Sequence, residues 1–133
     1  GGSATAITLR GKLIAVAVGS RRQVNVYKLS AGGTPALLAT TPTSLMGKKL
    51  SLAYPYLHLI EGNKSGWQHC LGGQGCCRVP TQVFTLDEQA GTLTLAGSYS
   101  TTEAILPFGA AFGRHVVIPL ERGYQVLRAE SAP

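Results

Sequence analysis

Acidic residues are scarce in this chain and absent from its first 60 positions. Charged residues make up only 14% of the 133 residues, which excludes the polar, strongly charged composition of disordered proteins. Long apolar runs are also missing. The longest, residues 13–18, is far below the roughly 18 residues that a membrane-spanning helix needs. We therefore expect a single folded domain, residues 1–133, without a transmembrane segment.

The start of the chain lacks an initiator methionine and the features of a signal peptide. Residues 1–5 have neither a basic start nor an apolar block. We therefore expect a processed product or one piece of a longer protein.

Glycine and proline are abundant, and they indicate many turns. The chain has 17 Gly and 7 Pro, and no stretch of ten residues keeps a helical period between capping residues. Short β-branched runs between turn residues predict an all-β fold of antiparallel meanders. Residues 13–18 are apolar in both phases of strand alternation, so this strand is expected to be covered on both faces. The predicted strands are residues 7–9, 13–18, 24–29, 36–40, 50–54, 56–60, 82–86, 92–99, around 105, 115–120 and 124–128.

Two strand pairs repeat the same pattern of glycine, apolar strand, turn and return strand. The pair within residues 11–29, and again the pair within 113–128, resembles the two middle strands of a β-propeller blade. Residues 56–60 with 82–86 form a third copy with an insertion between its strands. The resemblance implies three blade-like units, about residues 7–46, 47–101 and 102–133. Closed propellers have four to eight blades, so the chain would be part of a larger propeller or complete one with another copy. A β-sandwich or barrel is the alternative.

The most unusual segment is the glycine-rich insertion of residues 62–78. It contains the only tryptophan, Trp67, together with His69, Arg78 and all three cysteines. Insertions of this length are often functional, so Trp67, His69 and Arg78 are predicted binding residues.

The three cysteines allow several interpretations. Cys70 would form a disulfide with Cys76 or Cys77 in an oxidising compartment. His69 and the three cysteines would alternatively bind zinc, although the adjacent pairs lack the usual Cys-x-x-Cys spacing. One cysteine would otherwise act as a nucleophile, or all three would be reduced thiols in a surface loop. No cofactor is expected.

Positive charge is concentrated in the first half of the chain. Residues 1–60 carry +7, whereas residues 61–133 carry −1, which gives the net charge of +6. Such asymmetry is typical of surfaces that bind nucleic acid or another polyanion. The residues that would carry this binding are Arg10, Arg21, Arg22, Lys48 and Lys49.

Catalytic patterns are weak in this sequence. His58 is expected to pack within a strand, His115 to be exposed, and Asp87 with Glu88 to form a solvated turn. The leading hypothesis is therefore a non-catalytic binding or protein-interaction module, with contacts through residues 62–78 and the basic turns. Its partner would be another protein, the rest of a larger propeller or a second copy of the chain. The alternatives are nucleic-acid or polyanion binding, and an enzyme that uses a loop cysteine or a loop-bound metal.

Overall fold

The prediction of an all-β protein is confirmed by the computed structural model, which describes residues 2–61, 79–101, 110–112, 115–119 and 124–128. The only helix in these residues is the three-residue 3-10 turn η1 (Gly19–Arg21), so none is long enough to span a membrane. The strands are β1 (Ala4–Arg10), β2 (Leu13–Val18), β3 (Gln23–Leu29), β4 (Pro35–Pro42), β5 (Lys49–Ala53), β6 (Tyr56–Ile60), β7 (Val79–Asp87), β8 (Thr92–Thr101), β9 (Ala110–Phe112), β10 (His115–Pro119) and β11 (Tyr124–Arg128).

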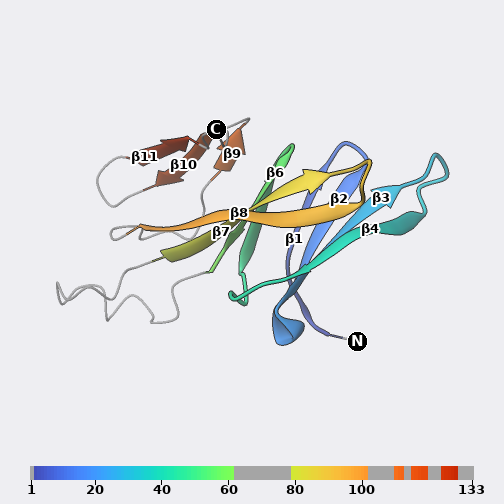
Figure 1. The fold of residues 1–133 in the computed structure, drawn as a ribbon, viewed down its shortest axis with the longest axis horizontal. Helices are drawn as coiled ribbons and strands as arrows, with labels where there is room; N and C mark the ends of the chain where they lie inside the picture. Colours follow the sequence, from blue (N-terminus) through green and yellow to red (C-terminus); the bar gives the residue numbers. More distant parts are fainter. Residues whose placement is uncertain (1, 62–78, 102–109, 113–114, 120–123, 129–133) are drawn as a thin grey trace.

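The strands form three antiparallel sheets, each a meander in chain order. Sheet A has the order β1-β2-β3-β4, sheet B the order β5-β6-β7-β8, and sheet C the order β11-β10-β9. The three sheets follow one another along the long axis of the molecule, with sheet B in the middle (Figure 1). Within the described ranges every sheet has two free edges, so none closes into a barrel.

The predicted strands correspond closely to the observed ones, with one addition. The repeated pairs from the sequence are β2 with β3, β6 with β7, and β10 with β11, and each pair is hydrogen-bonded. The short strand β9 was not expected, because three residues are too few to display an alternation. The strand predicted around residue 105 lies outside the described residues.

The hydrophobic core lies between sheets A and B. Alternate residues of their strands point inward and are almost fully buried. Apart from Leu13, sheet A contributes alanines and valines to this core, whereas sheet B contributes leucines and Phe84. The core residues are Leu13, Ala15, Ala17, Val24, Val26, Ala39, Leu50, Leu52, Leu57, Leu59, Phe84, Leu86 and Leu93.

Sheet B is also buried on its second face. Ala53, His58, Ile60 and Thr81 point away from sheet A, yet each has at most 5% of its surface exposed. Strand β9 of sheet C is a neighbour of β5. The middle sheet is thus covered from both directions.

Sheet A differs, because only one of its faces is covered. Leu13, Ala15 and Ala17 of β2 are buried, but the alternate residues Ile14 and Val16 remain partly accessible. The expectation that residues 13–18 are covered on both faces is therefore wrong for the isolated chain. The physical reason is position: sheet A is at the end of the stack, and no described element packs on its outer face.

The connection between sheets A and B is held by backbone hydrogen bonds and one close glycine contact. Thr43 donates its backbone N–H to the carbonyl oxygen of Arg22 at 2.8 Å, and Ser44 donates to Gln82 Oε1 at 3.2 Å. Gly47 has a φ of +64° and lies directly against the side chain of Leu59. A side chain at residue 47 would meet both a left-handed backbone and a buried leucine.

Replacing Gly47 with alanine is therefore expected to destabilise the protein more than replacing Gly11. Gly11 has the similar φ of +59°, but nothing lies within 4 Å of the position of its added Cβ. Gly11→Ala should cost about 1–2 kcal/mol of backbone strain, whereas Gly47→Ala should add roughly 1–3 kcal/mol of overpacking. Urea unfolding of both variants measures the difference. Equal losses would contradict the close contact with Leu59.

Candidate functional site

An apolar row crosses all four strands on the outer face of sheet A. Leu9 of β1 pairs with Ile14 of β2, Ile14 with Tyr27 of β3, and Tyr27 with Leu37 of β4. Cross-strand partners point to the same face, so the four side chains lie side by side. Ile7 and Val16 form the start of a second row. We call these six residues the outer strip: Ile7, Leu9, Ile14, Val16, Tyr27 and Leu37.

The outer strip is unusually accessible for large apolar side chains. Ile7 is 68% exposed, Leu9 64% and Leu37 59%, while the other three residues are half-buried. Single exposed leucines are common on protein surfaces, but contiguous apolar patches usually mark an interface.

A network of polar side chains lies beside the outer strip on β3 and β4. Gln23 Nε2 donates to Thr40 Oγ1 at 2.8 Å and also to Asn25 Oδ1. Thr40 donates to Asn25 Oδ1 at 2.7 Å, and Asn25 Nδ2 donates to the Tyr27 hydroxyl at 3.3 Å. Because these groups bind one another, another molecule could cover them without leaving them unpaired.

A second exposed apolar face lies on sheet C, at the other end of the stack. Val117 pairs with Val126, and Tyr124 precedes Val126 by two residues on β11, so these three side chains point to one face. Tyr124 is 71% exposed and Val126 49%. The two ends of the stack thus have the same chemical character.

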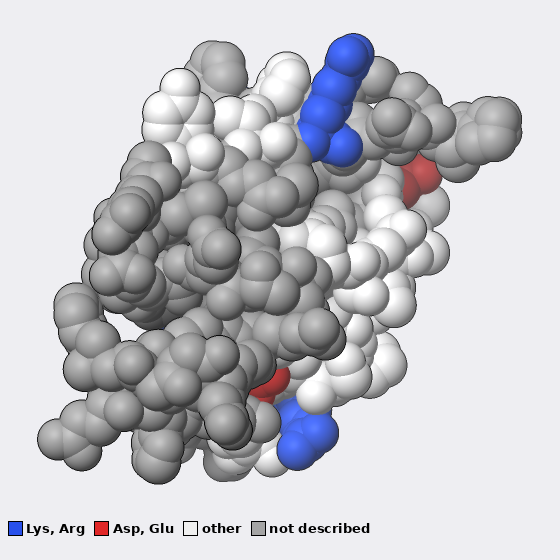
Figure 2. Space-filling view, turned by 90° about the vertical axis from the view of Figure 1, so that its left-hand side faces the viewer, with Lys and Arg blue, Asp and Glu red and all other residues white. Residues whose placement is uncertain are grey.

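The basic residues do not form one surface. Arg21 and Arg22 lie at the η1 end of sheet A, and Arg22 Nη1 donates to the carbonyl of Ser44 at 3.2 Å, close to the segment that leads to Lys48. Arg10 lies at the opposite end of β1, where its guanidinium donates to the carbonyl of Leu52 at 3.4 Å. The basic residues of the predicted polyanion surface thus lie at both ends of sheet A. On the face drawn in Figure 2, the described Lys and Arg side chains also lie in two separate places, near the top and near the bottom.

Lys48 and Lys49 differ in their surroundings. Lys48 is exposed, whereas Lys49 begins β5 and is half-buried. Burial lowers the pKa of Lys49. Among the residues that the structure describes, Arg21, Arg22 and Lys48 thus present the most accessible charge at the η1 end.

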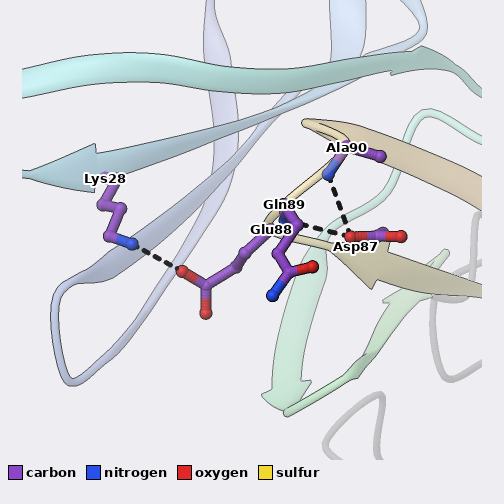
Figure 3. A network of polar contacts seen from close by, with 5 residues as sticks. All are labelled: Lys28, Asp87, Glu88, Gln89 and Ala90. Carbon is purple, nitrogen blue, oxygen red and sulfur yellow. Dashed lines mark hydrogen bonds and ion pairs between the residues drawn. The ribbon is translucent and has the colours of Figure 1, made fainter.

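Sheets A and B are joined by an ion pair that the sequence did not predict. Lys28 Nζ lies 2.8 Å from Glu88 Oε2, and Asp87 Oδ1 accepts the backbone N–H groups of Gln89 and Ala90 in the same turn (Figure 3). The hydrogen bond from Lys28 to Glu88 and the attraction between their charges raise the pKa of Lys28. The two residues are 60 positions apart, so no local pattern indicates their contact.

The predicted loop residues are outside the part of the chain that the structure describes. This applies to Trp67, His69 and Arg78, and to the disulfide or metal candidates Cys70, Cys76 and Cys77. In the described ranges no group of three or more His, Cys, Asp and Glu side chains is placed to hold a metal ion.

Two buried polar groups lie on the second face of sheet B. His58 is only 2% exposed, as expected for a strand histidine, and its Nδ1 has no hydrogen-bond partner among the described residues. Burial lowers the pKa of His58 to about 4, so the imidazole is neutral at pH 7. Burial also raises the pKa of Tyr99, an effect that the neighbouring Thr81 hydroxyl opposes without reaching hydrogen-bond geometry.

Comparisons with known proteins do not assign a family. No family model matches the chain, and no curated protein matches it significantly.

The buried His58 predicts a pH-dependent stability. Its folded pKa is depressed relative to the ordinary value of 6.5, so the unfolded state binds the proton more tightly. Stability should be complete above about pH 6.5 and decrease as the pH falls towards 4, by up to about 3 kcal/mol. Urea unfolding between pH 4 and 7 measures this change. In His58→Leu, the part of the pH dependence that comes from the histidine should disappear, while the part from other titrating groups should remain. An unchanged dependence of the free energy of unfolding on pH would contradict the role of His58.

Proposed function

We propose that this chain is a non-catalytic protein-interaction module whose main contact surface is the outer strip of sheet A. The observation that carries the proposal is the outer strip, in which Ile7 and Leu9 are more than 60% exposed. Burying one such side chain completely contributes about 1.5–3 kcal/mol. The hydrogen-bonded polar network beside the row lowers the cost of covering the same face.

We further propose that the three sheets are blade-like units of a partial β-propeller. The first strands of successive sheets are neighbours, since β1 lies beside β5 and β5 beside β9. The last strands β4 and β8 are also neighbours. Thr5 binds the carbonyl of Met46 and Arg10 that of Leu52, so β1 and the start of sheet B run in the same direction. Equivalent strands of neighbouring blades have this relationship. A sandwich of sheets A and B alone would account for neither sheet C nor the exposed apolar end.

Residues 62–78 are proposed as a second contact segment. Glu61 donates its backbone N–H to the carbonyl of Pro80 at 3.0 Å, so the two ends of this segment meet at a hydrogen bond between neighbouring strands. Loops carried by rigid strands are frequent binding sites. A short Gly-Ser linker from Glu61 to Val79 would replace the segment without separating β6 from β7.

A photo-crosslinking residue in place of Leu9 tests the proposed surface in cells. We expect discrete crosslinked polypeptides from residue 9 and none from residue 95, where Leu95 is a comparably exposed leucine away from the outer strip. The same experiment in the linker variant measures the contribution of residues 62–78. Equal crosslinking from both leucines, or none from residue 9, would contradict the proposed function.

Polyanion binding is the second candidate, now limited to the η1 end. The exposed basic residues there are Arg21, Arg22 and Lys48, and Arg22 contacts the segment between β4 and β5 that leads to Lys48. Arg10 and Lys12 lie at the other end of β1. A Lys or Arg that neutralises a phosphate releases a counterion. The logarithm of the binding constant therefore falls linearly with the logarithm of the salt concentration, with a slope of about −0.9 per phosphate contact.

The double variant Arg21→Ser and Lys48→Ser should therefore reduce the salt slope of binding to a DNA duplex by roughly 2. The matched control is Arg10→Ser with Lys12→Ser, which removes the same charge from the opposite end and should leave the slope unchanged. Fluorescence anisotropy across a salt series gives both slopes. If both variants lower the salt slope equally, the binding depends on net charge alone and not on the η1 end.

A further inference from the structure

The two ends of the stack are chemically alike and both uncovered. The outer strip lies at one end, and Val117, Tyr124 and Val126 lie at the other. Between them, sheet B is covered on both faces. Two apolar sheet faces, one at each end of the stack, are therefore left without a neighbouring sheet among the described residues.

We propose that two copies of this chain associate head to tail, with the outer strip of one copy against the exposed face of sheet C of the other. This inference rests on the proposed function, because it names the partner of the same surface. The contact continues the stacking within the chain, where first strands lie beside first strands. Two copies with three sheets each give six sheets, within the four to eight of closed propellers.

The size of the two end faces agrees with a stable dimer. Sheet A has four strands of about seven residues, which gives a projected area of roughly 440 Å² at about 4.8 Å per strand and 3.3 Å per residue. The described part of sheet C gives roughly 240 Å² in the same way. A closed pair brings together two faces of each kind. The smaller face of sheet C limits each contact, so the pair buries roughly 1,000 Å² in total, about the minimum for a specific interface.

The charges of the two faces are compatible with this contact. His115 and Arg128 lie at one edge of the exposed face of sheet C. The described side chains on the outer face of sheet A include no Lys or Arg, so Arg128 would meet no like charge there. Gln23, Asn25, Tyr27 and Thr40 on that face bond to one another, which lowers the cost of covering them.

Sedimentation velocity over a micromolar concentration series tests the association. We expect the native chain to form a species with twice the mass of one chain. Leu9→Lys should raise the dissociation constant at least about 100-fold, because an unpaired ammonium would be buried in the contact. Leu37→Lys, on the opposite edge of the sheet, should act in the same direction. Leu95→Lys is the matched control and should leave the dimer intact, since Leu95 lies on neither end face.

A mixture of two variants distinguishes head-to-tail association from pairing of identical faces. Val126→Glu alone should also dissociate the dimer. An equimolar mixture with Leu9→Lys should restore it, because one interface then pairs Lys with Glu and the other is native. A dimer that persists in Val126→Glu would instead indicate two outer strips in contact, and would overturn the proposal.

A monomeric native chain, or an open series of larger assemblies, would also overturn the proposal. Circular dichroism of each variant separates dissociation from unfolding. Failure of this inference differs from failure of the proposed function: a monomeric chain that still crosslinks from residue 9 to another polypeptide keeps the interaction surface and excludes only the second copy.

Discussion

The burial of sheet B between two neighbours is the constraint on which the rest of the structure depends. Its leucines and Phe84 fill the core against sheet A, while Ala53, His58 and Ile60 are buried on the other side. A sheet that is buried on both faces needs a neighbour on each side, which sheet A supplies on one face of sheet B. Burial of an apolar sheet face is also favoured at the two ends of the stack, where the outer strip and the exposed face of sheet C have no neighbour among the described residues.

Local patterns in the sequence predicted the strands well, because alternation and turn residues act over a few positions. The pairs β2–β3, β6–β7 and β10–β11 were expected, and His58 was expected within a strand. The three-residue β9 carries too little pattern to be recognised. The apolar residues in both phases of β2 predicted burial on both faces, but only one face is buried, because no described element packs on the outer face of sheet A.

Long-range contacts explain why the candidate site was harder to predict than the fold. The basic residues of the first half appear as one group in the sequence, yet the antiparallel turn after β1 sends Arg10 and Arg21 to opposite ends of sheet A. The ion pair of Lys28 with Glu88 joins positions 60 residues apart. The outer strip likewise depends on the register of four strands, since Leu9 and Leu37 become part of one row only when all three pairings are known.

The backbone hydrogen bond between Glu61 and Pro80 affects how readily the sequence of residues 62–78 can change in evolution. This bond fixes the positions of Glu61 and Pro80, the residues that flank 62–78. The stability of the stacked sheets should therefore depend only weakly on the length of the segment between them. Doubling the length of a flexible insertion costs only about 0.6 kcal/mol. The position is therefore a natural graft site, where recombination or protein engineering can exchange whole peptides while the stacked sheets keep their fold.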